Sequence, residues 1–424
     1  MQTDQVFGIS PEVREHSYVD RGNLDSALAT MLKRTTHIAV RGPSKSGKSW
    51  LRQKVLGNPI TVQCRLKKPF TDIYTDALSQ LDINIQVKES RQGVFKATLT
   101  ANGEVGAGLL AKVGITGSIG RDTTKMAEQR IVGHDINDLR YIANIIKSSD
   151  RRLVLEDFHY MSTPDRRNFA FDLKALWDYG VFVIIIGVWS QTNLLLYLNP
   201  DLTGRVTEIP IDWVNDDLVR ILTKGGEALN IDFTPKIRDL LVSLSYSNAG
   251  LLQQLTLLTL DEAGIREKGF FKKRIDNTNH VGDASMLYAE QLNPVYLQFA
   301  KRVAADVRTR KNATGIYAHA MAVILEASDD ELVKGLHARK IFERARKRQE
   351  RIQYSNLKAI LDQLEGLQVD DDGRGLILGY SPATEEITVV DRQLLLYRRF
   401  ATIKWPWEDI IREADALGGQ IEAG

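Results

Sequence analysis

Five short apolar runs alternate with longer segments of helical period in the first half of the chain. The runs are residues 37–41, 59–65, 152–157, 181–187 and 205–211, and each is rich in Ile, Val or Leu. The segments between them repeat apolar residues at helical spacing and cover residues 48–57, 71–82, 134–147 and 165–178. This alternation is typical of a parallel sheet with helices on both faces. The pattern therefore predicts a three-layer α/β domain over residues 34–212.

A glycine-rich stretch interrupts this alternation. Seven glycines lie among small and apolar residues between positions 93 and 120, and Asn102-Gly103 is a strong hairpin signal. We expect an inserted β-hairpin at about residues 90–122. It could contact a partner or a neighbouring subunit, or it could be a decoration, because glycine-rich strands specify their register poorly.

Helical patterns replace the strands after residue 213. Two helices at 215–229 and 235–262 predict a small lid over residues 213–263, and the charged, glycine-bearing segment 264–287 is expected to be a linker. Helical stretches follow at 288–310, 316–327, 329–349 and 354–366, and then come the strand-like segments GLILGY and EEITVVD. Three helices and a β-ribbon are typical of a winged helix. Residues 288–424 are therefore expected to form a helical, winged-helix-like module.

Residues 42–49, GPSKSGKS, fill every fixed position of the phosphate-binding pattern G-x-x-x-x-G-K-[ST] directly after the first predicted strand. Two glycines let successive backbone N–H groups point at phosphates, and the helix beginning at Lys48 adds the positive end of its dipole. We expect Lys48 to face solvent in the empty site and to reach the β- and γ-phosphates of a nucleotide. The Ser49 hydroxyl is expected to bind Mg²⁺. The motif thus predicts a triphosphate-binding set of Gly42, Pro43, Ser44, Lys45, Ser46, Gly47, Lys48, Ser49 and Trp50, with a simple glycine-rich turn as the alternative.

Two acidic residues follow the third predicted strand. Leu153-Val154-Leu155 runs directly into Glu156 and Asp157. Neighbouring strand side chains point to opposite faces, so one carboxylate can complete a magnesium shell while the other orients the attacking water. We assign Glu156 to the metal and Asp157 to the water, at the edge of the metal site. The alternative is a pair of acids that only ends a strand.

Taken in order, YVDR (residues 18–21), GPSKSGKS, LVLEDFHY, VFVIIIGVWS and NPDLTGRVTEI resemble an AAA+ or STAND-type P-loop ATPase. The resemblance covers residues 15–262 and is greatest to the branch with origin-recognition ATPases, transposon target-selection ATPases and ATPases of bacterial phage-defence loci. It implies that residues 1–33 include an adenine-contacting segment with Tyr18 and Val19. It also implies a sensor-1 polar residue at Ser190, with Gln191 as the alternative. Arg205 is then an arginine finger acting in trans, unless a salt bridge to Asp201 or Glu208 makes it structural.

The chain departs from this family in two further places. Its strand-end acids read Glu-Asp where the family usually has Asp-Glu, so Asp157 is one methylene short and hydrolysis is expected to be slow. In SNAGLLQQL, residues 247–255, the apolar Leu251 and Leu252 stand where a sensor-2 arginine often lies. The lid is therefore expected to sense the γ-phosphate weakly.

The densest basic run of the chain lies in the C-terminal module. Residues 339–351 hold seven Arg or Lys against two Glu. On a helix, Arg344, Lys347, Arg348 and Arg351 could neutralise DNA phosphates next to a candidate recognition helix at 354–360. A solvated helix face, or a module that binds protein, is the alternative. Trp405-Pro406-Trp407 is read either as core packing or as a docking point for a partner.

Composition changes this picture little. The 424 residues imply more than one domain, and a net charge of +2 gives no argument for a nucleic-acid or membrane partner by itself. The longest apolar run, residues 181–189, is about half of what a bilayer needs, so no membrane contact is expected. One cysteine cannot form an internal disulfide, and a cytoplasmic protein is the simplest interpretation.

The resemblance and the absence of any nuclease, protease or TIR-like constellation favour an ATP-dependent switch whose output is carried by an effector protein. Homo-oligomer formation through ATP and Mg²⁺, in bacterial antiphage defence, is the favoured hypothesis. One alternative is a DNA-binding ATPase that selects or loads a target in replication or transposition. Another is a nucleotide-bound scaffold that never turns over.

Overall fold

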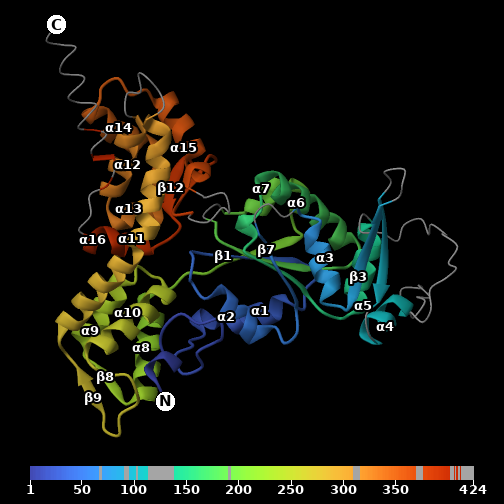
Figure 1. The fold of residues 1–424 in the computed structure, drawn as a ribbon, viewed down its shortest axis with the longest axis horizontal. Helices are drawn as coiled ribbons and strands as arrows, with labels where there is room; N and C mark the ends of the chain where they lie inside the picture. The colour runs from blue at the N-terminus through green and yellow to red at the C-terminus, as the bar shows by residue number, and fades with distance from the viewer. Residues whose placement is uncertain are drawn as a thin grey trace.

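The computed structural model describes residues 1–65, 69–89, 95–101, 104–112, 138–189, 192–308, 316–368, 376–401, 405, 407–408 and 411. Across these residues, no helix is both long and apolar enough to cross a bilayer. Figure 1 shows a central sheet with its helices, a helical lid beside the N-terminus, and a C-terminal module joined to the lid.

The central sheet has five parallel strands in the order β2-β5-β6-β1-β7. They are β1 (His37–Arg41), β2 (Ile60–Gln63), β5 (Leu153–Glu156), β6 (Val183–Gly187) and β7 (Val206–Pro210). Each lies within one of the five predicted apolar runs. Parallel strands of this kind are buried on both faces, which is why they appear in the sequence as short continuous apolar runs.

Helices cover both faces of this sheet, as the three-layer prediction required. Ile38, Val40 and Val154 pack toward α1 (Leu24–Met31) and α2 (Lys48–Val55), whereas their neighbours Ala39 and Leu155 belong to the apolar cluster of the opposite face. That second face is covered by α3 (Asp72–Ser79), α5 (Leu139–Ser148) and α6 (Thr163–Asp178). The alternation of strand side chains thus divides one sheet between two cores. Residues 134–137, the expected start of α5, lie outside the described residues.

The inserted hairpin lies earlier in the chain than predicted. β3 (Ile83–Glu89) pairs antiparallel with β4 (Phe95–Ala101), and α4 (Glu104–Lys112) follows where the second strand was expected. The predicted turn, Asn102-Gly103, lies outside the described residues and comes after β4, the second strand of the observed pair. Gly106 has a packing reason instead, because a Cβ at this position would lie 2.4 Å from the backbone oxygen of Asp82.

The lid contains strands, so the prediction that they stop at residue 213 is wrong. It consists of α8 (Asn215–Leu229), β8 (Ile231–Phe233), α9 (Pro235–Leu244), α10 (Ala249–Glu262) and β9 (Lys273–Ile275). β8 and β9 pair in parallel. A strand of three residues is too short to show a period of two in the sequence.

The predicted linker at 264–287 is also wrong. α11 (Thr278–Arg308) begins inside it, packs on α10, and continues into the C-terminal module (Figure 1). One apolar core runs from Phe7 through the lid helices to Leu396. Lid and C-terminal module are therefore joined by a helix and share a core.

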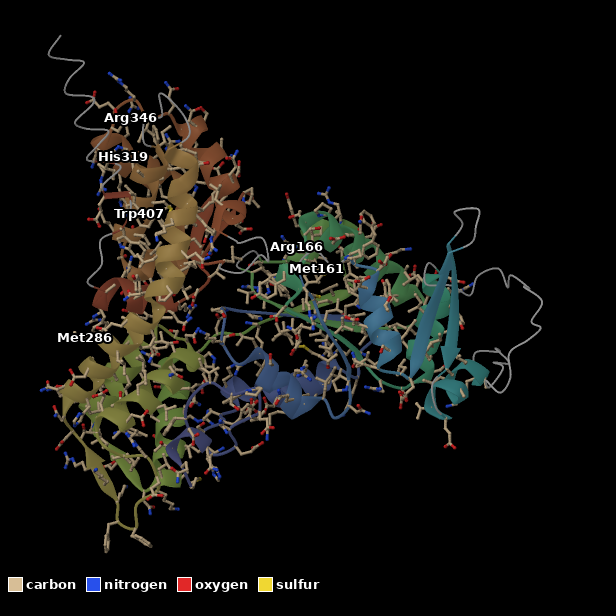
Figure 2. The ribbon with its side chains drawn as sticks, viewed as in Figure 1. Met161, Arg166, Met286, His319, Arg346 and Trp407 are labelled. Atoms are coloured by element: carbon tan, nitrogen blue, oxygen red, sulfur yellow. The ribbon has the colours of Figure 1, made fainter. Side chains whose placement is uncertain are left out.

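The C-terminal module contains α12 (Ile316–Glu326), α13 (Asp329–Lys334), β10 (Leu336–His337), α14 (Ala338–Arg348), α15 (Tyr354–Gln368), β11 (Leu378–Ser381), β12 (Glu386–Val389) and α16 (Gln393–Phe400). Its three strands form an antiparallel sheet in the order β10-β12-β11. The predicted helix 329–349 is broken at Gly335, whose φ of 118° an L side chain rarely adopts. Figure 2 shows Trp407 within this module, and its ring stacks on Trp405 at 4.9 Å, which fits core packing.

Candidate functional site

A cavity of about 260 Å³ lies where the loop after β1, the N-terminal segment and the lid meet. Many of the predicted site residues line it together: Tyr18, Val19, Ser44, Lys45, Ser46, Gly47, Lys48, Ser49, Trp50 and Asp157. Further wall residues come from the lid; the sequence predicted that the lid senses the γ-phosphate weakly but assigned none of its residues to the site. The structure therefore brings the phosphate-loop motif and the N-terminal segment to one cavity.

The loop conformation explains both of its glycines. Gly42 approaches the sheet so closely that a Cβ would lie 2.9 Å from the Cβ of Ile211. Gly47 has a φ of 85°, in the left-handed region that favours glycine, and α2 begins directly after it at Lys48. The loop thus presents its backbone and the positive end of an eight-residue helix to the cavity.

Lys48 does not face solvent, contrary to the sequence-based expectation. Its side chain is 8% exposed, and Nζ donates to the backbone oxygens of Gly42 (3.0 Å) and Pro43 (2.6 Å). Gly42 and Pro43 are absent from the cavity wall and instead hold this lysine. Burial lowers the pKa of Lys48 to about 7, with Asp157 as the strongest opposing charge.

The two acids at the end of β5 have different environments. Asp157 lines the cavity, takes a left-handed φ of 55°, and accepts a hydrogen bond from the Gln63 amide. Burial, followed by the charge of Glu156, raises its pKa. Glu156 is not part of the cavity wall and is bound by Arg52, whose Nε lies 2.8 Å from Oε1. Asp157 is therefore the acid that faces the loop and Lys48.

Arg21 is a site residue that the sequence reading missed. It lines the cavity at 5% exposure, and its guanidinium carbon lies 4.5 Å from the centre of the Trp213 ring. Trp213 is fixed in turn, because its indole N–H donates to the oxygen of Ser46 (2.9 Å). Arg21 Nε and Nη2 have no hydrogen-bond partner among the described residues. The signal was present, since Arg21 ends the YVDR segment from which only Tyr18 and Val19 were assigned.

Gln253 is a second missed residue, on the lid side of the cavity. It is 3% exposed, and its Nε2 donates to Ser17 Oγ (3.0 Å), while Ser17 Oγ donates to the oxygen of Val6 (2.5 Å). Because a serine hydroxyl has one proton, Ser17 must accept from Gln253, and this fixes which end of the amide faces Ser17. The Gln253 oxygen is left buried without a partner in the described part of the chain.

The lid is docked on the phosphate loop. Asn248 Nδ2 donates to the oxygen of Ser44 (2.7 Å), and the amide of Gly250 donates to the oxygen of Lys45 (3.0 Å). Leu251 and Leu252 are fully buried in the lid core. The lid therefore contacts the loop through its backbone and Asn248. Leu251 and Leu252, which stand where a sensor-2 arginine was considered, pack in the lid core and place no positive charge in the cavity.

The N-terminal segment is held against the loop by its own contacts. The Trp50 indole N–H donates to the oxygen of Ser10 (2.9 Å), and the Tyr18 hydroxyl donates to Asp25 (2.7 Å). Lys224 of the lid donates to the backbone oxygen of Tyr18 (2.8 Å). These contacts give the cavity a wall made of three separate parts of the sequence.

Arg205 lies at the amino-terminal end of the parallel strands, whereas the phosphate loop lies at their carboxyl-terminal end. It precedes β7, and its backbone oxygen accepts from the amide of His37 at the start of β1, whereas the phosphate loop follows the end of β1. Its Nη1 donates to the backbone oxygen of Asp201 (2.5 Å), and its guanidinium lies over the Trp177 ring. The carboxylate of Glu208 pairs with Arg41 instead. The predicted alternative, a salt bridge to Asp201 or Glu208, is therefore not made. Ser190 and Gln191 lie outside the described residues.

Much of the basic run in the C-terminal module is neutralised by the chain itself. Arg344 pairs with Glu331 (2.7 Å), and Arg348 pairs with Glu326. In the candidate recognition helix, Lys358 pairs with Glu385. Lys347 and Arg351 make no ion pair with the described residues, and Figure 2 shows Arg346 of the same run at the far end of the module from the central sheet. The predicted DNA contact is thus left with few free cations.

No protein-family model matches the chain, and no curated protein matches it significantly. Solved structures do resemble it. One is an Orc1 protein of Aeropyrum pernix in complex with DNA, at 14% identity over 92% of this chain and 94% of that one, with a TM-score of 0.38. A STAND protein with a tetratricopeptide repeat sensor from Pyrococcus horikoshii matches 94% of this chain and 44% of that one at 11% identity and a TM-score of 0.37. The RuvB Holliday junction branch migration motor of Thermotoga maritima matches at 11% identity over 87% and 89%, with a TM-score of 0.36.

The chain has a three-layer α/β fold in which a phosphate-loop motif follows the first strand of a five-stranded parallel sheet. Its parallel sheet carries the phosphate loop after β1 and the acidic pair at the end of β5, with β6 between these two strands in the order β2-β5-β6-β1-β7. The lid and the N-terminal segment complete the wall of the cavity beside the phosphate loop.

Proposed function

We propose that this protein binds ATP with Mg²⁺ in the cavity, hydrolyses it slowly, and acts as a nucleotide-dependent switch. The observation that carries the proposal is a set of buried atoms that have no hydrogen-bond partner among the described residues, on one cation and one amide, in the wall of a cavity built on a phosphate loop. Arg21 supplies the cation and Gln253 the acceptor. Buried polar groups are costly unless they are hydrogen-bonded, so a ligand that satisfies both is expected.

The phosphate end of the cavity fits a triphosphate. Backbone amides of the loop, Arg21 and Lys48 supply donors and positive charge within one wall. Ser49 is the residue that would hold Mg²⁺, with Asp157 at the edge of the metal site; Mg²⁺ takes few protein ligands and, when bound, neutralises phosphate charge. Glu156, the other predicted metal ligand, would first have to leave Arg52.

Base recognition follows from the fixed orientation of Gln253. Its free oxygen accepts hydrogen bonds only, and it lies in the wall beside Tyr18 and Val19. The exocyclic amine of adenine donates, whereas guanine has an oxygen at the corresponding position, so two acceptors would face each other. The cavity therefore favours ATP over GTP.

The proposed catalytic step is water orientation by Asp157. Gln63 holds this carboxylate from the side of β2 while it faces the loop. The side chain is one methylene shorter than the glutamate usual at this position, so it is less able to reach an attacking water. Slow turnover suits a switch that must persist in its triphosphate state.

Assembly is proposed from the position of Arg205. Arg205 lies at the opposite end of the strands from its own phosphate loop. It can therefore act only on the site of a neighbouring subunit. Its partners are a backbone oxygen and the Trp177 ring, and it makes no salt bridge with the residues that the structure describes. A homo-oligomer follows, and an effector protein in antiphage defence remains the favoured output on the family resemblance of the sequence.

The order of α12, α14 and α15 with the three-stranded sheet supports a winged-helix C-terminal module. Two other functions stay open: a DNA-binding ATPase that selects or loads a target, and a nucleotide-bound scaffold without turnover. Phosphate release, measured at rising protein concentration with and without DNA, separates them. The switch is supported if the rate of phosphate release per protein molecule rises with protein concentration and is unchanged by DNA. Stimulation by DNA supports target selection, and ATP binding without any release supports the scaffold.

A further inference from the structure

The lid carries two bare aromatic side chains on one short loop. We call residues 266–272, between α10 and β9, the lid loop. Phe270 and Phe271 are 101% and 89% exposed, well above every other large apolar side chain among the described residues. In Figure 1 this loop reaches outward below β8 and β9, at the end of the lid away from the C-terminal module.

The backbone of the lid loop is firmly anchored. The amide of Lys268 donates to the oxygen of Met1 (2.9 Å), and Asn230 Nδ2 donates to the oxygen of Gly269 (2.7 Å). On the far side, the amide of Lys273 donates to the oxygen of Asn230 (2.8 Å). The rings are therefore presented by an ordered segment, which lowers the entropy cost of binding something to them.

Positive charge surrounds these rings. The segment from 266 to 274 contains one acid, Glu267, which is bound by Gln2, and five cations: Arg266, Lys268, Lys272, Lys273 and Arg274. None of the five makes a salt bridge with any residue that the structure describes. This contrasts with the basic run at 339–351, where carboxylates of the same chain bind Arg344 and Arg348.

We propose that the lid loop is a binding surface for single-stranded nucleic acid. Unpaired bases stack on the faces of Phe270 and Phe271, and the flanking lysines contact the phosphates. Base stacking on an aromatic ring contributes about 1–3 kcal/mol per base and tolerates any sequence, while the cations add a salt-dependent contribution. A flat open loop suits this role because a stacked base needs a ring face and no pocket.

The arrangement of the cations favours a nucleic acid over a lipid surface. Lys273 and Arg274 are neighbours on β9 and are both exposed, so they project to opposite sides of the strand. A flexible strand can place phosphates on both sides of the rings, whereas a planar anionic bilayer meets them from one side only. The proposal concerns a surface separate from the ATP cavity and does not depend on nucleotide binding.

Anisotropy of a labelled oligothymidylate of about 20 nucleotides tests the proposal on the full chain. The double variant Phe270→Ser, Phe271→Ser should bind at least about tenfold more weakly than wild type, and Lys268→Glu with Lys272→Glu should reduce the salt dependence. Phe171→Ser is the matched control, because Phe171 is an aromatic residue 54% exposed on α6. It should bind within about twofold of wild type.

Thermal unfolding is the control for folding. Because the changed side chains are exposed to solvent, each variant should unfold at nearly the same temperature as wild type. Equal binding by wild type and the double phenylalanine variant would overturn the proposal, as would no binding by wild type. Loss of binding in Lys347→Glu with Arg351→Glu alone would place the nucleic-acid surface on the C-terminal module. Binding of wild type to phosphatidylserine vesicles but not to the oligonucleotide, lost in the phenylalanine variant, would replace the proposal with a membrane surface.

Discussion

At the scale of single residues, the site is defined by side chains whose burial is unusual for their type. Lys48, Arg21 and Gln253 are all less than a tenth exposed. Lysine and arginine are rarely buried unless they are paired. Lys48 is satisfied by the loop itself, while the other two are held by Ser17 and Trp213 in orientations that leave hydrogen-bonding atoms free.

The buried Lys48 predicts a pH dependence of ATP affinity. Its pKa of about 7 lies well below the ordinary value, so the side chain loses its proton as pH rises above 7. ATP phosphates favour the charged form, so binding should take up a proton. Affinity should fall about twentyfold between pH 7.5 and pH 9, as measured by titration calorimetry.

Lys48→Arg provides the control, because a guanidinium stays charged throughout this range. Its affinity should change by less than about twofold over the same pH interval. The same fall in both proteins would mean that another group titrates.

Gln253→Met should remove the preference for adenine. The methionine keeps the length of the side chain but has no strong acceptor, so ATP affinity should fall about tenfold while GTP affinity is unchanged or higher. Ser17→Ala should lower the ratio of ATP to GTP affinity less than Gln253→Met does. Without the Ser17 hydroxyl, the Gln253 amide could flip and present either its oxygen or its nitrogen to the base. Competition against a fluorescent ATP analogue measures both ratios, and an unaltered ratio in Gln253→Met would exclude this residue from base recognition.

At the scale of elements, the closure of α10 on the phosphate loop depends on a glycine. A Cβ at Gly250 would lie 2.6 Å from the Cβ and from the backbone oxygen of Lys45. Cβ atoms essentially never approach other atoms this closely, so either the start of α10 or the phosphate loop must move. The hydrogen bond from the amide of Gly250 to Lys45 would be lost with that movement.

Gly250→Ala should therefore weaken ATP binding at least about tenfold and leave the fold intact, because the loss of a hydrogen bond and of lid closure is local. Gly282→Ala is the matched control, since Gly282 lies in α11 with no atom within 4 Å of the added Cβ. That change should raise the unfolding free energy by up to about 1 kcal/mol and leave binding unaltered. Equal binding by both variants would show that the lid does not close the site.

How far the sequence could predict these elements depended on the range of the interactions. The five sheet strands are confirmed, because a strand buried on both faces leaves an apolar run that needs no other information. The start of α11 was missed, because glycine, lysine and asparagine residues before it are typical of a linker and only packing on α10 shows otherwise. β8 is too short for any pattern.

The candidate site shows the same limit. The loop motif correctly predicted a helix that begins at Lys48 directly after Gly47, because this geometry is local to eight residues. The inward turn of Lys48 and the pairing of Glu156 with Arg52 depend on three-dimensional contacts. Gln253 had no signal, because it lies in a helix that is buried on nearly every side.

At the scale of the whole molecule, the C-terminal module touches the phosphate loop directly. Lys45 Nζ donates to Gln393 of α16 (2.7 Å), and Arg392 donates to the backbone oxygens of Tyr246 and Ser247, just before α10. Loop, lid and C-terminal module are therefore linked by a continuous set of contacts. Such a link gives the nucleotide a physical route to the far end of the chain.

Arg205 decides whether this molecule works alone or through assembly. A guanidinium supplied in trans contributes on the order of 10³ to 10⁵ in rate in other NTPases. Arg205→Ala should cut phosphate release at least about a hundredfold and leave ATP affinity nearly unchanged. Mixing it with Lys48→Ala, which retains Arg205, should restore part of the activity. A mixture no more active than its two components would make Arg205 structural, with a side chain held by Asp201 and Trp177.

The most direct test of an ATP-hydrolysing cavity is phosphate release and ATP binding measured on the same preparation of wild type and Asp157→Asn. Wild type should bind ATP and release phosphate slowly. Asp157→Asn should bind ATP within about threefold of wild type and release none, because an amide cannot accept a proton from the attacking water. Asp178→Asn, a surface acid paired with Lys174, should behave as wild type. Failure of wild type to bind ATP, or wild-type turnover in Asp157→Asn, would contradict the account.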